Sequence, residues 1–237
     1  MPPDLQKLPL DSEAVNEGGI GMNRDDEPDW MGREGARSNS PQPPDLVRMG
    51  IWFYGGMALV AVLWRVGLYG EPIFYASSEA EQQGLSWIRN ITLGVVVGGT
   101  VVGISYVLTS LTGWGERLAR ELARTLGPLS VPDALLMAAA SGFAEELLFR
   151  GALQPRAGLI LASLLFGVVH FVPRREMLPW TGFAIAVGLL FGLMFEQTGN
   201  LIAPVVAHTV VNGVNLPLLV RRYGSNGDQP ADPPDQL

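Results

Sequence analysis

The sequence has no cysteine and only two histidines, His170 and His208, among its 237 residues. The lack of cysteine excludes a disulfide-stabilised fold, a thiolate zinc site and a cysteine nucleophile. Charged residues are also scarce, at 16% of the chain, whereas an average soluble domain has about 25%. Any histidine-dependent chemistry must therefore use these two side chains, within a chain that is largely apolar.

The charge that is present lies mostly at the N-terminus. Residues 1–46 contain ten acidic and four basic side chains, so their net charge of −6 is nearly the whole formal charge of −7. This acidic balance argues against a nucleic-acid partner, because such binding needs clustered Lys and Arg. Low hydrophobicity predicts that residues 1–46 are a disordered, acidic, cytoplasmic tail and that residues 223–237 are a disordered C-terminal tail.

Between the tails the chain is a series of long runs with few charges. Residues 90–115 contain no charged side chain, and such a run is longer than the ~20 residues that cross a bilayer core of ~30 Å. The other runs are 49–68, 134–154, 157–172, 178–195 and 200–220. We therefore predict an all-α, polytopic transmembrane helical bundle of about six spans over residues 47–222. A large soluble all-α core is the alternative, and six apolar runs in so short a segment argue against it.

Arginines recur in alternate segments between these runs. They are Arg48, Arg117, Arg120, Arg124, Arg174, Arg175, Arg221 and Arg222. Because positive residues near span ends stay on the cytoplasmic side, this pattern predicts an integral membrane protein with both termini in the cytoplasm. The lack of an organelle-targeting segment favours a bacterial inner membrane.

Polar residues inside the apolar runs are expensive there, and are by default either functional or paired. They are Glu145, Glu146, Arg150, His170, His208 and Asn212. Glu146 and Arg150 are four residues apart, so they face each other on a helix and can form an ion pair. Glu145 is rotated by about 100° from Glu146 and has no such local partner, which leaves it as a candidate general base. The alternative is a helix-end salt bridge at the membrane interface.

Both histidines also lie in pairs with a helical spacing of four residues. Phe166 and His170 form one pair, and His208 and Asn212 form the other. Two donors on one helical face can stabilise a developing oxyanion. A satisfied core histidine and an interhelical polar clasp are the structural alternatives. Six polar side chains within three of the predicted spans favour a catalytic site.

The depths of these residues in straight helices do not agree. Helix geometry places Glu145 about 18 Å and His208 about 20 Å from the cytoplasmic ends of their spans. The same arithmetic places His170 only about 5–10 Å from that side. Tilted, broken or unequal helices would reconcile these depths.

Three motifs in this region resemble those of a known family. EELLFR, FGVVH and AHTVVN fit the EExxxR, FxxxH and HxxxN motifs of the CAAX protease and bacteriocin-processing (CPBP, or Abi) family of intramembrane endopeptidases, and they occur in the family's order. The resemblance covers residues 131–220, which form the motif core of the predicted peptidase domain at 47–222. It implies a glutamic-type protease that cleaves a membrane-associated protein or peptide, such as a C-terminal processing or sorting signal.

The resemblance also implies a role for each polar residue. Glu145 would activate a water molecule with the help of His170, while His208 and Asn212 would bind the oxyanion of the tetrahedral intermediate. Glu146 and Arg150 would position the site. The implied partners are the substrate and the lipid bilayer, with no nucleic acid.

Two alternatives stay open for this chemistry. Glu145, His170 and His208 also have the donor types of a zinc site with an open position. The sequence lacks HExxH, so we favour a site without a metal or other cofactor. A non-catalytic membrane binding or bacteriocin-immunity protein is the second functional hypothesis. An ion-coupled transporter ranks lower, because the two halves show no internal repeat.

Overall fold

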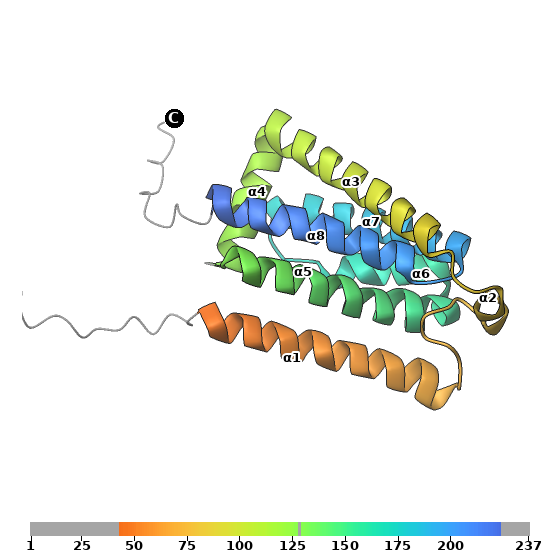
Figure 1. Cartoon of the computed structure of the whole chain (residues 1–237). Helices are drawn as coiled ribbons and strands as arrows, with labels where there is room; N and C mark the ends of the chain where they lie inside the picture. The colour runs from red at the N-terminus through yellow and green to blue at the C-terminus, as the bar shows by residue number, and fades with distance from the viewer. Residues whose placement is uncertain (1–42, 128, 224–237) are drawn as a thin grey trace, which may run out of the picture. The chain divides into compact units, whose positions relative to one another are not determined.

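The computed structural model describes residues 43–127 and 129–223 (Figure 1). These residues are nearly all helical and form no strand, apart from one isolated bridge between Tyr75 and Asn200. The predicted tails lie almost wholly outside the described residues. Helix α1 (Pro43–Val62) begins within the last residues of the first predicted tail, and α8 (Ile202–Tyr223) ends at the first residue of the second.

Five helical segments are long and apolar enough to cross a membrane. They are Leu46–Leu68, Trp87–Leu111, Val131–Val169, Arg175–Thr198 and Ile202–Tyr223. The predicted all-α membrane bundle is therefore confirmed, with five candidate spans among the described residues where about six were expected. The difference arises because the predicted runs 134–154 and 157–172 join into one continuous helical segment.

That joined segment contains three parts. Helix α5 (Val131–Glu146) runs into a π-helix, η2 (Leu147–Leu153), which is followed by α6 (Gln154–Val169). The chain bends inside α6 at Gly158, whose φ of +77° lies in the left-handed region that favours glycine. Only eleven residues of α6 follow this bend, and they are about 16 Å long, which is too short for a full span.

Helix α8 is packed closely against α3 (Trp87–Leu111). A Cβ atom at Gly94 would lie 2.7 Å from the carbonyl oxygen of Ala203, and one at Gly98 would lie 2.7 Å from that of Ala207. Small residues at four-residue intervals let helix backbones approach in a membrane. A larger residue at either glycine would therefore separate the two helices.

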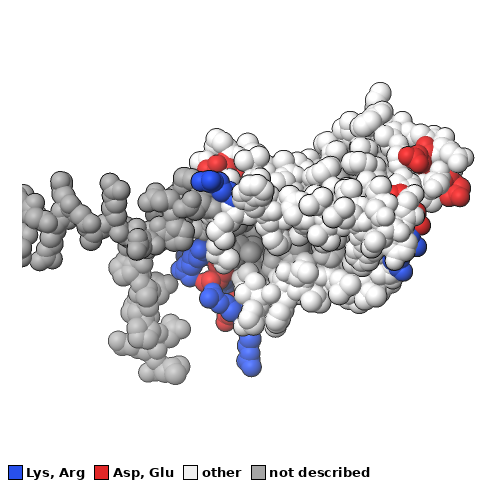
Figure 2. Space-filling model, turned by 90° about the horizontal axis from the view of Figure 1, so that it is seen from below, with Lys and Arg blue, Asp and Glu red and all other residues white. Residues whose placement is uncertain are grey.

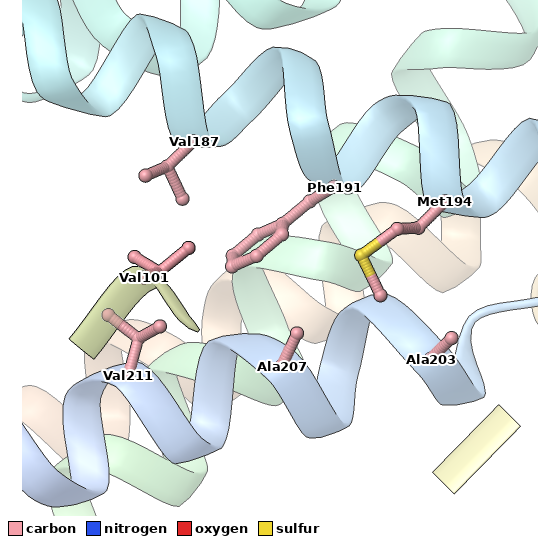
Figure 3. Packing of buried hydrophobic residues seen from close by; sticks show 7 residues of the cluster. All are labelled: Val101, Val187, Phe191, Met194, Ala203, Ala207 and Val211. Atoms are coloured by element: carbon pink, nitrogen blue, oxygen red, sulfur yellow. The ribbon is translucent and has the colours of Figure 1, made fainter. Parts of the chain in front are cut away.

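The largest buried apolar cluster joins α3, α8 and α7 (Leu178–Thr198). Figure 3 shows Phe191 and Met194 of α7 lying between α7 and α8. The complete cluster is Val101, Val187, Phe191, Met194, Ala203, Ala207 and Val211. This packing fixes the positions of α7 and α8, and several side chains of the site extend from these two helices.

The two ends of the bundle carry different short elements. The start of α1, the end of α8 and the amphipathic helix α4 (Gly113–Leu126) lie at one end, which we call the α4 end (Figure 1). At the opposite end, α1 continues into a π-helix, η1 (Leu63–Leu68). A short helix, α2 (Ser78–Gln83), also lies there, and we call this the α2 end. On the face in Figure 2, charged side chains gather at both ends and leave an uncharged band between them. This distribution fits a protein whose middle lies in lipid.

Helix α4 does not qualify as a span and packs against α3 and α8 through Gly115, Ala119 and Ala123. Its other face is charged. Arg120 donates a hydrogen bond to Glu116 at 2.8 Å and lowers the pKa of that exposed carboxyl. Arg174, which precedes the short 3₁₀-helix η3 (Arg175–Met177), contacts Glu121 of α4 at 3.3 Å.

Candidate active site

A cavity of about 320 Å³ brings together side chains from α1, α4, α5, α6, α7 and α8. Four of the six predicted site residues line it: Glu145, His170, His208 and Asn212. Most of the other lining side chains are apolar or aromatic, including Trp180 and Phe183 of α7. The cavity is thus an apolar pocket with a few convergent polar groups, which is typical of a binding or active site.

Glu145 lies in the last turn of α5 and is only 7% exposed. Its Oε2 atom is buried and has no hydrogen-bond partner among the described residues. The Nε2 atom of His170 lies 3.7 Å from Oε2, and the Nε2 atom of His208 lies 4.0 Å from it. Both separations exceed a direct hydrogen bond and leave room for a bridging water.

The other ring nitrogen of each histidine has a defined partner. The Nδ1 atom of His170 lies 2.7 Å from the carbonyl oxygen of Phe166, and Nδ1 of His208 lies 2.8 Å from Oε1 of Glu146. A carbonyl can only accept, so Nδ1 of His170 carries the proton and its Nε2 faces Glu145 as an acceptor when the ring is neutral. The Glu146 carboxylate fixes the ring of His208 in the same way.

Glu146 and Arg150 form the predicted ion pair, and both are almost completely buried. Arg150 Nε lies 3.1 Å from Glu146 Oε2, and its Nη2 donates to the carbonyl oxygen of Gly188 at 2.9 Å. The guanidinium also lies 4.4 Å from the centre of the Phe166 ring. Neither residue lines the cavity. The pair instead links α5 and η2 to α6 and α7, and it holds His208 through Glu146.

The short α6 reconciles the depths that the sequence left in conflict. His170 is the C-cap of α6, only twelve residues after the bend at Gly158. Because α6 ends partway along the bundle, His170 meets Glu145 there instead of lying near the end of a complete span. The π-helix η2 begins directly after Glu146 and contains Arg150, and π-helical turns often occur at functional sites.

Three further side chains of the cavity were not singled out from the sequence. Ser141 accepts a hydrogen bond from Nδ2 of Asn212 at 2.9 Å, and its position one turn before Glu145 was a usable signal. Trp180 packs edge-on against His170, with ring centres 5.9 Å apart. Tyr54 enters from α1, and no local pattern in the sequence connects it to the motifs.

Glu145, His170 and His208 have the donor types of a zinc site. Bonds of 2.0–2.1 Å in a tetrahedral zinc site place neighbouring ligand atoms about 3.3 Å apart. The separations of 3.7 and 4.0 Å around Glu145 are wider, and no three His, Cys, Asp or Glu side chains within residues 43–127 and 129–223 are arranged to hold a metal ion. The mechanism proposed for this site is derived from its side chains alone.

Residues 127–214 match the family described as type II CAAX prenyl endopeptidase Rce1-like. This segment is similar to that family, and we call it the Rce1-like segment. It contains all six predicted site residues, and it confirms the family resemblance for the motif core. The Rce1-like segment begins after α4 and ends within α8, so α1, α3 and α4 lie outside it.

One curated relative is similar over nearly the same length. It is described as "Uncharacterized protein YpbD" from Bacillus subtilis (strain 168), and it is 42% identical over 87 residues. The match spans 36% of this chain and 44% of the relative, less than half of either. No solved structure matches the chain significantly. The protease family and the five apolar helices together support an integral membrane protein.

Proposed function

We propose that this protein is an intramembrane endopeptidase that hydrolyses a peptide bond of a membrane-associated protein or peptide. One observation carries the proposal: the buried Glu145 carboxylate keeps an unpartnered oxygen that faces the Nε2 atoms of two histidines across a cavity. A buried charge without a partner is costly in a membrane bundle, and such groups mark functional sites.

In this reaction a water molecule binds between Glu145 and His170. It donates one hydrogen bond to Oε2 of Glu145 and one to Nε2 of His170, which are 3.7 Å apart. Because both protons of the water are donated in these hydrogen bonds, a lone pair on its oxygen can point at the substrate. This arrangement is general-base catalysis by a positioned carboxylate.

The water oxygen then attacks the carbonyl carbon, and its proton passes to Glu145. His208 and Asn212 donate hydrogen bonds to the resulting oxyanion, which stabilises the charge that develops in the transition state. In this role His208 carries protons on both ring nitrogens, one of them donated to Glu146. Glu145 then returns its proton to the leaving nitrogen as the C–N bond breaks, and the products are a carboxylic acid and an amine.

Glu146 and Arg150 act as positioning residues in this mechanism. Glu146 holds the His208 ring at 2.8 Å, and Arg150 ties Glu146 to the backbone of α7 at Gly188. Catalytic groups must keep their mutual geometry within a fraction of an ångström. A fully buried pair with several hydrogen bonds supplies that rigidity.

The proposed setting is a bacterial inner membrane with both termini in the cytoplasm. Three arginines of α4 and two in the last turn of α8 lie at the α4 end of the bundle, which supports a cytoplasmic location for that end. The apolar lining of the cavity suits a substrate segment that is itself membrane-associated, such as a C-terminal processing or sorting signal.

The proposal is tested in membranes of the native host that contain the wild type or the Glu145→Gln variant at equal abundance. Glu81→Gln is the matched control, because Glu81 is exposed on α2, at the opposite end of the bundle from the cavity-lining residues Thr125 and Leu126 of α4. Mass spectrometry then compares new peptide N- and C-termini. We expect a defined set of termini to disappear with Glu145→Gln and to persist with Glu81→Gln. Unchanged termini would refute the protease and favour a binding or immunity protein.

A further inference from the structure

Helix α1 lies outside the Rce1-like segment, yet it packs directly against α5 and η2. The contact is close at Gly50, where a Cβ atom would lie 2.7 Å from the Sδ atom of Met137 on α5. One helical turn further along α1, Tyr54 lines the same cavity as Glu145. The position of Tyr54 is therefore fixed by the fit of α1 against α5.

The neighbours of Tyr54 on α1 face the other way. Trp52 is 80% exposed and Phe53 is 61% exposed, as expected for side chains that face lipid, whereas Tyr54 is half-buried. The hydroxyl of Tyr54 lies near the carboxylate of Glu145 and the hydroxyl of Ser141. A tyrosine hydroxyl turned into an apolar bundle normally finds a hydrogen-bond partner there.

Four polar groups from three helices line the same cavity: Tyr54, Ser141, Glu145 and Asn212. Asn212 donates to Ser141 at 2.9 Å, which leaves the Tyr54 hydroxyl available to Glu145. Among the residues that the structure describes, no arginine or lysine forms an ion pair with Glu145, whereas Glu146 beside it pairs with Arg150. An oriented donor is therefore needed if its carboxylate is to keep one orientation toward the water.

We propose that Tyr54 is a positioning residue of this protease, whose hydroxyl donates a hydrogen bond to Glu145 and holds the carboxylate toward His170. This inference rests on the proposed function and extends the active site to a helix that the family match does not include. The carboxylate accepts a hydrogen bond from the phenol and keeps its negative charge, so it still serves as the base for the bridging water.

The test uses the full-length protein reconstituted in liposomes, with a synthetic peptide that spans a cleavage site found by the comparison of termini. We expect Tyr54→Phe to lower kcat about tenfold, because a hydrogen bond to a charged group is lost, and to leave KM within about twofold of the wild type. Its thermal transition in detergent stays unchanged. Tyr106→Phe is the matched control, since Tyr106 is 61% exposed on α3, and it retains wild-type kinetics.

A second substitution, Tyr54→Leu, separates positioning from packing. If the hydroxyl acts, Phe and Leu variants lose kcat to a similar extent; if ring packing acts, only the Leu variant does. Wild-type kcat in Tyr54→Phe, or a change in KM or melting temperature alone, would overturn the inference while leaving the protease intact. If the wild type cleaves nothing that the Glu145→Gln variant fails to cleave, both proposals fall.

Discussion

Arg65 and Glu145 are both buried charged side chains of the same bundle, but their surroundings differ. At the α2 end, Arg65 lies 2.8 Å from Glu71 and donates to the carbonyl oxygens of Pro72 and Ala76. Glu71 also pairs with Arg156 at 2.6 Å. In the cavity, one oxygen of Glu145 has no hydrogen-bond partner among the described residues.

The asparagines show the same contrast. The Nδ2 atom of Asn90 donates to Oδ1 of Asn200 at 3.1 Å, and Asn200 also contacts the backbone at Thr198 and Ile202. Within the described part of the chain, the side chain of Asn212 in the cavity makes one such bond, to Ser141. Polar groups whose hydrogen bonds are all made within the protein join helices. Polar groups that have unused donors or acceptors inside a bundle can bind a substrate or a water molecule.

The largest expected effect separates activity from stability at Glu145. We expect Glu145→Gln to lower the cleavage rate about 10³-fold, within the range of lost general-base catalysis. The melting temperature stays equal to that of the wild type or rises, because a buried, incompletely paired charge is removed. The measurement is the cleavage rate in liposomes beside a thermal melt in detergent. A clear fall in melting temperature would place Glu145 among the structural residues.

The opposite pattern is expected at Arg65. We expect Arg65→Met to lower the free energy of unfolding by about 2 kcal/mol, because Glu71 and two backbone carbonyls lose their donor. The activity per folded molecule stays close to that of the wild type. Denaturation curves and rates normalised to the folded fraction check this. A loss of catalysis at full stability would mean that the α2 end takes part in the reaction.

A smaller effect is expected for the amide contact between α3 and the turn before α8. Asn90→Ala leaves Oδ1 of Asn200 with its bond from Ile202, so we expect a loss of only about 1 kcal/mol. Thr100→Ala is a suitable control, because the Thr100 side chain donates to Val96 of its own helix and is exposed. Equal stability in the two variants would show that the amide pair adds nothing.

The smallest effect is expected from removing metal. If the site acts through its side chains alone, then treatment with a strong chelator leaves the cleavage rate unchanged, and elemental analysis of the active protein finds far less than one zinc per chain. The chelated sample is compared with one to which zinc is added back. Loss of cleavage that zinc restores would instead assign Glu145, His170 and His208 as ligands.

The local part of the site was predictable from the sequence because it depends on helical spacing. Glu146 and Arg150 pair as expected, and the Phe166 and His170 rings lie 4.7 Å apart, one turn from each other. The membrane bundle was predictable from the apolar runs in the same way. These features need no knowledge of how the helices are arranged.

Features that depend on helix packing were not predictable. The bond from His208 to Glu146 joins residues 62 positions apart, and Tyr54 comes from a helix that no motif links to the site. The length of α6 was also missed, since Gly158 lies in an apolar run that reads as continuous with a span. One positive φ angle there decides where the helix bends.

The short α6 has a consequence for the supply of water. Hydrolysis consumes one water molecule per bond, and lipid holds almost none. After His170 the chain continues through a non-helical stretch to Arg174, whose side chain contacts Glu121 of α4. Backbone outside a helix is tolerated at membrane depth only where protein buries it or where it borders a water-filled space. The stretch that lets His170 reach Glu145 is therefore also the place where we expect water to enter from the α4 end.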